Sequence, residues 1–114
     1  MEKEQALQIF SALSQGTRLD ALTLLVQAGD DGIKAGDVAQ HLGVRHNLMS
    51  QHLSVLGAAG LVSSERLGRT ILYRANFAAL RGVASFLMAR CCQGLPEIIE
   101  GLEATALQTK GATA

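Results

Sequence analysis

The only two cysteines of the chain, Cys91 and Cys92, are adjacent and come shortly before its only proline, Pro96. A single cysteine is often a small buried hydrophobe, and this packing role is the simplest interpretation of each thiol. A disulfide between neighbouring residues would close a strained small ring. Where thiols stay reduced, paired cysteines are more often ligands or sensors than disulfides. We therefore expect Cys91 and Cys92 to form a site for a thiophilic ligand.

A second set of side chains that could do chemistry lies between residues 46 and 54. Asparagine and glutamine can pair with adenine edges, while serine and histidine can contact bases or phosphates. The set consists of His46, Asn47, Ser50, Gln51, His52 and Ser54. Arg66 and Arg69 follow in the chain and suit contacts with phosphates or the minor groove. These residues predict DNA binding, and the simpler alternative is a solvated polar face.

The composition limits the classes of protein that these sites can belong to. A chain of 114 residues with 48% apolar residues is enough for one domain with a core. Its ten basic and ten acidic residues give no net charge, which argues against a general polyanion binder. No apolar run approaches the length of a membrane span, and the polar start "MEKEQALQIF" differs from a signal peptide. We expect a cytoplasmic protein with no membrane partner.

The charges are unevenly distributed along the chain. Residues 34–74 hold five basic side chains against two acidic ones, together with all three histidines. The histidines are His41, His46 and His52. A local basic segment is typical of a small nucleic-acid footprint, although three net charges can also cluster by chance.

Helical periodicity predicts two helices in the first third of the chain. The first covers residues 4–14, and the second begins at Thr17 as its cap and ends at Gly29. The apolar positions of the first are Leu7, Phe10 and Leu13, and those of the second are Leu19, Leu22, Leu25 and Val26.

The next two helical runs are separated by only two or three residues. The first covers residues 35–42, with Val38, Ala39 and Leu42 as its buried set and Gly43 as its stop. The second runs from His46 towards Gly60, with Met49, Leu53 and Leu56 facing inward. Two short helices joined by so tight a turn predict a helix-turn-helix, which presents the polar residues of the second helix outward.

A β-hairpin and a long helix complete the expected fold. Residues 61–66 and 70–75 have the period of strands, and the turn between them contains Gly68. The last helix is capped by Asn76, continues its apolar stripe to Cys91 and stops at Gly94. This order predicts a mainly α fold with a small β-hairpin, a winged helix-turn-helix. We expect one domain over residues 1–104, with a weaker amphipathic piece near its end, and a flexible tail over 105–114.

Two stretches carry a resemblance to a known family. "ALSQGTRLDALTLL" resembles the Ala-Leu-x-x-x-Thr-Arg-Leu stretch before the second helix of the ArsR/SmtB metal-responsive repressors, and "MSQHLSVLGAAGLVSSERLGRTILYRA" resembles their recognition helix and wing. The Ser-x-His-Leu core is Ser50 to Leu53, and the wing pattern is Gly68 and Tyr73. The resemblance covers roughly residues 6–92. It implies a homodimer formed by the first and last helices, bound to operator DNA through one recognition helix per subunit.

The resemblance also bears on the ligand of the thiols. Zinc-sensing members use histidine and carboxylates on the last helix, but residues 77–94 contain none, so we expect no zinc site. Similar arsenic-responsive members carry Cys-Cys at this place, often with a third cysteine after the Pro-Glu, where this chain has Ile98 and Ile99. Inorganic trivalent arsenic prefers three thiolates, whereas methylarsenite needs two. The expected inducer is a trivalent arsenical held by Cys91 and Cys92: methylarsenite, or arsenite or antimonite if another group completes the site.

Three other functions are compatible with parts of the sequence. A redox or persulfide sensor of the same fold would use the same thiols, and a constitutive DNA-binding module would leave them as packing residues. A thiol enzyme is disfavoured, because no anion-binding loop surrounds the cysteines and no base lies on their helix. We therefore expect a repressor rather than an enzyme.

Overall fold

The computed structural model describes residues 1–91 of the chain. The elements in chain order are α1 (Lys3–Leu13), α2 (Gly16–Ala28), a 3₁₀ turn (Gly29–Asp31), β1 (Ile33–Lys34), α3 (Ala35–Leu42), α4 (His46–Ala58), β2 (Val62–Leu67), β3 (Thr70–Ala75) and α5 (Phe77–Cys91). The predicted helix end at Gly94, the amphipathic piece after it and the tail over 105–114 lie outside the described residues. No helix of the described part is long and apolar enough to span a membrane.

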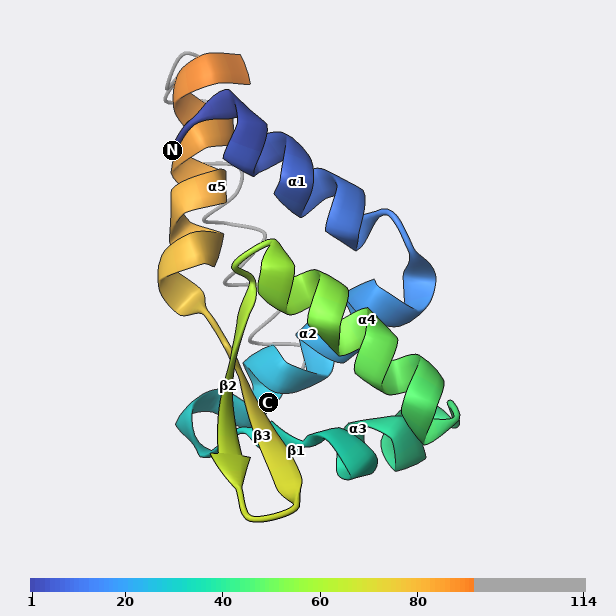
Figure 1. Cartoon of the computed structure of the whole chain (residues 1–114). Coiled ribbons are helices and arrows are strands. Elements are labelled where there is room, and N and C mark those ends of the chain that lie inside the picture. Colours follow the sequence, from blue (N-terminus) through green and yellow to red (C-terminus); the bar gives the residue numbers. More distant parts are fainter. Residues whose placement is uncertain (92–114) are drawn as a thin grey trace, which may run out of the picture.

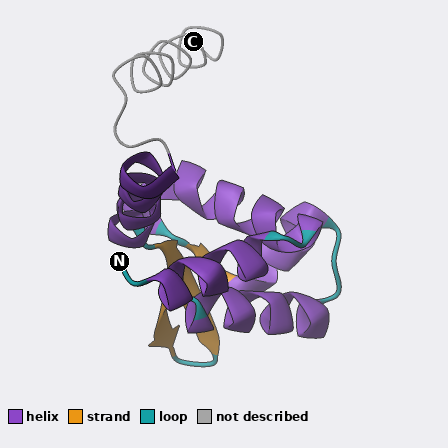
Figure 2. Cartoon of the chain, turned by 90° about the horizontal axis from the view of Figure 1, so that it is seen from above, coloured by secondary structure: helices purple, strands orange, loops and turns teal. Residues whose placement is uncertain are grey.

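The helices gather on one side of a small sheet, and a hairpin projects from them. Figure 1 shows α1 and α5 side by side at one end of the molecule, with the tip of the β2–β3 hairpin at the other. Seen from above in Figure 2, the helices form one continuous body beside the strands. The arrangement is the winged helix-turn-helix that the sequence predicts, with α3 and α4 as its two helices.

The sheet contains one strand that the sequence pattern did not predict. Its antiparallel order is β1-β3-β2, with Ile33 opposite Tyr73 in the added pair. A strand of two residues is too short to show an alternating pattern. In the predicted hairpin, Leu67 pairs with Thr70, so Gly68 and Arg69 form the turn. Gly68 has a φ of 64°, which glycine adopts without strain.

The large side chains at the centre of the core come from the first four helices and the corner that follows α4. Seven large side chains are fully buried: Ile9, Val38, Leu25, Met49, Leu53, Leu56 and Leu61. The predicted inward faces of α3 and α4 are thus confirmed, with Leu42 half-buried at the edge of the core. Burying these apolar surfaces is the main force that fixes α4 on the rest of the domain.

The predicted apolar positions of α1 were only partly correct: Leu13 is half-buried and packs against the core, but Leu7 and Phe10 do not. Its buried positions are Ala6, Ile9 and Ala12, whereas Leu7 is 55% exposed and Phe10 is 38% exposed. Ile9 packs into the core between the two alanines, and Leu7 and Phe10 remain on the outside. The helix therefore carries an apolar outer surface that the described chain leaves uncovered.

Two features of α2 also differ from the prediction. The helix begins at Gly16, and its cap is Gln15 rather than Thr17: the Gln15 side chain accepts a 2.8 Å hydrogen bond from the Arg18 amide. Leu22 and Leu25 are buried as predicted, but Leu19 and Val26 are exposed. Ala21 takes the remaining inward position.

Gly32 provides a stability test of the corner that leads into β1. Its φ of 69° and ψ of −179° lie in a region open almost only to glycine. A Cβ atom there would also lie 2.6 Å from the Tyr73 carbonyl oxygen. We expect Gly32→Ala to lower the free energy of unfolding by about 2–4 kcal/mol. Urea unfolding at a fixed protein concentration measures this.

Gly36→Ala is the matched control. Gly36 lies in α3, has no positive φ, and a Cβ there would meet no atom within 4 Å. Alanine favours a helix over glycine by up to about 1 kcal/mol, so this change should be neutral or stabilising. Equal loss of stability in both variants would contradict the strained geometry at Gly32.

Candidate nucleic-acid interface

The turn between α3 and α4 is closed by backbone hydrogen bonds. Gly43 adopts the left-handed conformation, with a φ of 67°, and the Val44 amide donates to the Ala39 carbonyl over 3.0 Å. Glycine at this position ends a helix without steric cost. The turn fixes the direction in which α4 leaves, and therefore the direction of its first residues.

The first turn of α4 is stabilised by a side chain of the helix itself and not by its N-cap residue. Arg45 stands at the N-cap but makes no side-chain capping bond. Instead, the Asn47 Oδ1 atom accepts a 2.9 Å hydrogen bond from the Leu48 amide. Within residues 1–91 the Asn47 Nδ2 group donates no hydrogen bond, so it can contact a base edge while the oxygen holds the helix start.

The outer surface of α4 carries three of the predicted DNA contacts. Because Met49, Leu53 and Leu56 are buried, the helical repeat directs the opposite side to solvent. Asn47, Gln51 and Ser54 lie there, and all three are exposed. We call these three residues the reading face.

His46 and Ser50 lie on the flank of α4 that faces the hairpin. Both line a pocket of about 390 Å³ between the start of α3, the start of α4 and the sheet. The other lining residues are Lys34, Ala35, Gly36, Asp37, Arg69, Thr70, Ile71 and Tyr73. The pocket joins the reading face to the hairpin, so both can lie against one continuous partner.

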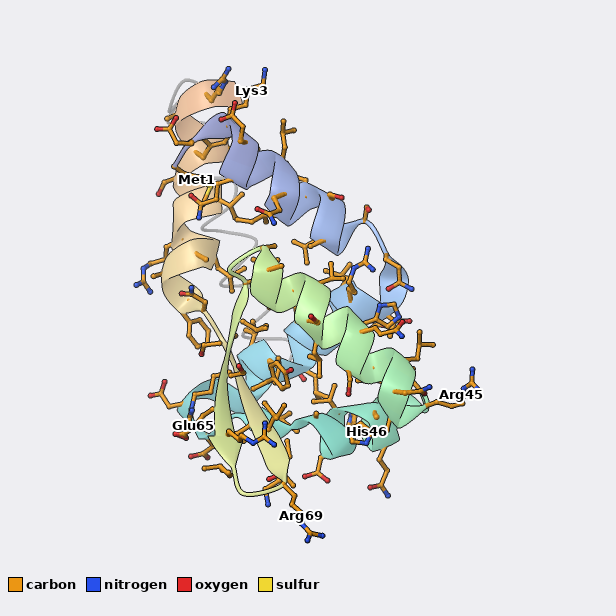
Figure 3. The ribbon with its side chains drawn as sticks, in the orientation of Figure 1. Met1, Lys3, Arg45, His46, Glu65 and Arg69 are labelled. Carbon is orange, nitrogen blue, oxygen red and sulfur yellow. The ribbon has the colours of Figure 1, made fainter. Side chains whose placement is uncertain are left out.

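The cationic side chains around this surface come from separate elements. Figure 3 shows Arg69 projecting from the hairpin tip and Arg45 from the start of α4, with His46 between them. Arg66 stands opposite Ile71 in the register, so it shares the sheet face of that pocket residue. Arg74 is instead occupied: its Nε donates to the Asp30 carbonyl over 2.8 Å, and Nη1 lies 3.6 Å from Glu65 Oε2.

His52 differs from the other predicted site residues. It is half-buried on the flank of α4 away from the hairpin, and its Nδ1 lies 3.5 Å from Arg18 Nη1. The Arg18 Nε atom in turn donates to the Ala12 carbonyl over 2.7 Å. This contact links α4 to the corner between α1 and α2. The structure thus gives His52 a position beside the reading face rather than on it.

Sequence reasoning missed two cations of this surface. Arg45 is exposed immediately before α4, and Lys34 lines the pocket from the edge of the sheet. Arg45 had a usable signal, since it directly precedes the predicted recognition helix. No local sequence signal identified Lys34, because its place beside the hairpin depends on the pairing of β1 with β3.

Asn76 joins α5 to the far end of α4. Its side-chain oxygen accepts from the Ala79 amide at 3.2 Å, which confirms the predicted cap. Its Nδ2 donates to the Gly60 carbonyl over 2.9 Å, and its amide donates to the Leu61 carbonyl over 2.8 Å. One residue thus holds both the start of α5 and the corner that follows α4.

The described residues reach only the first of the two cysteines. Cys91 is the last residue of α5, and Cys92 lies outside the described part. Just before Cys91, the Arg90 guanidinium lies 5.5 Å from the centre of the Phe86 ring. Within residues 1–91, no three histidine, cysteine or acidic side chains are grouped closely enough to hold a metal ion.

Comparisons with known proteins bear on the family. No protein-family model matches the chain. The transcriptional repressor SdpR of Bacillus subtilis is 34% identical over 80 residues, covering 70% of this chain and 86% of that protein. An ArsR-like transcriptional regulator from a Rhodococcus species is 32% identical, with a TM-score of 0.65 over 97% of this chain and 93% of that one.

A third similar protein is a homodimer. The homodimeric winged helix-turn-helix DNA-binding domain of a possible ArsR-family transcriptional regulator from Mycobacterium bovis is 28% identical, with a TM-score of 0.63. It covers 75% of this chain and 78% of that domain. The names of all three describe transcriptional regulators rather than enzymes. Together with the helix-turn-helix and hairpin described above, these similarities show that the chain belongs to the ArsR family of winged-helix transcriptional regulators.

Proposed function

We propose that this regulator is a homodimeric repressor that leaves its operator when a trivalent arsenical binds Cys91 and Cys92. The observation that carries the proposal is that Cys91, the first of two adjacent cysteines in the sequence, is the last residue of α5. The start of the same helix is hydrogen-bonded to the corner that follows α4. The protein would act in the cytoplasm, where both thiols stay reduced.

The exposed apolar surface of α1 supports the homodimer. Leu7 and Phe10 point away from the domain core, and α1 lies beside α5 (Figure 1). A second copy would bury these side chains, and the homodimeric Mycobacterium bovis domain shows that the fold can pair. A symmetric pair would place one α4 in each of two successive major grooves.

The reading face and the cations support operator binding. Amide groups of Asn47 and Gln51 can bond adenine edges, with Ser54 beside them. Arg66 and Arg69 on the hairpin, and Arg45 at the helix start, can neutralise phosphates on either side. Because the net charge of the chain is zero, these local cations must supply most of the attraction to DNA.

The number of thiols favours an arsenical with two exchangeable positions. Methylarsenite carries two hydroxyl groups; each thiol that forms an As–S bond releases one water molecule, and the As–C bond stays intact. Two cysteines per chain therefore complete the site. Inorganic arsenite has a third position, for which the proposal requires water, another side chain or the partner subunit.

The link through Asn76 provides a path for release. Ligand binding at the end of α5 can move its start, which is hydrogen-bonded to the corner after α4. For release, the arsenical must bind the DNA-free form better than the bound form by about 1–3 kcal/mol, an ordinary allosteric coupling.

Fluorescence anisotropy of a labelled operator duplex tests the proposal, with the duplex selected from randomised DNA by the unchanged protein. We expect release of the preformed complex by methylarsenite, a weaker response to arsenite, and none to zinc. Retention of DNA with every arsenical would overturn the arsenical role. Release by a mild oxidant or persulfide donor instead, with a matching mass change on the thiols, would favour the redox alternative.

A further inference from the structure

Two large apolar side chains on α4 are exposed although the helix packs firmly on the core. Leu48 is 39% exposed and Val55 is 41% exposed. They are seven residues apart, so they share one flank of the helix, beside the reading face and away from the hairpin. Neither belongs to the core of the described chain. An exposed leucine beside polar side chains suited to DNA can contact an apolar group of the same partner.

Leu48 and Val55 differ in their distance from the start of α4. Leu48 is in the first turn, directly after Asn47 and three residues before Gln51. In helix-turn-helix proteins, the N-terminal residues of the second helix contact base edges. Val55 lies two turns further along, towards the corner that Asn76 holds. Of these two side chains, only Leu48 therefore lies in the part of the helix that contacts base edges in the major groove.

The major groove offers one apolar group, the C5-methyl of thymine. We propose that Leu48 contacts this methyl group and so selects thymine at one position of each half-site. The inference rests on the proposed reading role of α4 and adds a specificity that hydrogen bonds from Asn47 and Gln51 cannot supply. Its occupant is operator DNA rather than a second copy, because the start of α4 lies away from the side-by-side α1 and α5 (Figure 1).

The local geometry holds Leu48 in place for such a contact. Its amide donates to Asn47 Oδ1 over 2.9 Å, and its neighbour Met49 is fully buried. The backbone of Leu48 is thus fixed on both sides. Burying one methyl group contributes about 0.8 kcal/mol, which is about a fourfold change in affinity per half-site. A symmetric dimer contacting two half-sites would show about a fifteenfold change.

Deoxyuridine, which lacks only the methyl group, tests this directly. In an operator selected by the unchanged protein, each thymine is replaced in turn, symmetrically in both half-sites, and the dissociation constant is measured. We expect one thymine position whose replacement weakens binding by about fifteenfold. In Leu48→Ala, the same replacement should raise the dissociation constant by less than about twofold, while Leu48→Met should keep most of the loss in affinity. Circular dichroism melting checks that both variants are folded.

Val55→Ala is the matched control, because it removes a similarly exposed apolar side chain from the same flank. It should keep the full penalty for deoxyuridine. An equal penalty in Leu48→Ala and the unchanged protein, or no thymine that matters at all, would overturn the inference while leaving operator binding intact. If the unchanged protein selects no duplex, the proposed function itself fails.

Discussion

A Cys91→Ser/Cys92→Ser variant is expected to bind the operator normally and to keep it when methylarsenite is added. Serine has nearly the shape of cysteine, but its hydroxyl does not form the soft As–S bond, so the ligand loses its site. The unchanged protein should lose operator affinity by about 5–150-fold at saturating methylarsenite, and the variant by none. Anisotropy titrations of both proteins, with and without the arsenical, measure the difference.

Ser85→Ala is a suitable control on the same helix, because this exposed residue carries no thiol. It should respond to methylarsenite as the unchanged protein does. Ile98→Cys or Ile99→Cys would supply the third thiol that the sequence lacks, and should raise the response to arsenite more than that to methylarsenite. A double serine variant that is still released by the arsenical would show that the thiols are not the sensor.

Gln51→Ala is expected to cause the largest loss of operator affinity among single changes to the reading face. An amide that bonds an adenine edge in two places contributes about 1–3 kcal/mol, and a dimer makes the contact twice. The loss should therefore be about 2–6 kcal/mol for the selected operator and close to zero for unrelated DNA. Anisotropy with both duplexes, at one salt concentration, gives the ratio.

Two further variants serve as references for a sequence-specific loss of DNA affinity. Gln27→Ala removes an exposed glutamine from α2 and should change neither duplex. Arg69→Ala should weaken both duplexes alike and reduce the salt slope by about 0.9 for each phosphate that is no longer neutralised. If Gln51→Ala weakens both duplexes equally, the residue contacts the backbone and does not read bases.

The sequence predicted the helix-turn-helix unit well because its signals are local and strong. Gly43 marks the turn, and Met49, Leu53 and Leu56 leave only one way to bury α4. The inward face of α1 could not be predicted in the same way. Leu7 and Phe10 have the correct spacing for a core stripe, but Ala6, Ile9 and Ala12 occupy the inner positions. Hydrophobicity alone does not distinguish a side chain of the core from an apolar side chain that remains on the surface.

The candidate site was only partly readable for a related reason. The polar set on α4 follows from its helical repeat, so Asn47, Gln51 and Ser54 could be placed in advance. The position of His52 depends on Arg18, which lies 34 residues earlier and meets it only through the folding of α2 against α4. The place of Lys34 depends in the same way on a strand of two residues. Contacts between distant segments leave no local pattern.

The hydrogen bonds of Asn76 connect the start of α5 to the corner after α4, so a rotation of α5 about this residue would be transmitted to α4. From Asn76, α5 extends through its 15 residues for about 22 Å, and α4 extends the other way for about 20 Å. A movement of about 2 Å at Cys91 then amounts to a turn of only about 5° at the pivot. If α5 and α4 rotate as one rigid body, His46 at the start of α4 moves by nearly the same distance. In a symmetric dimer, the separation of the two α4 helices then changes by up to about 4 Å. A change of about 4 Å in the separation of two recognition helices is small against a half-site spacing of about 34 Å, but it is several times a hydrogen-bond tolerance of about 0.5 Å.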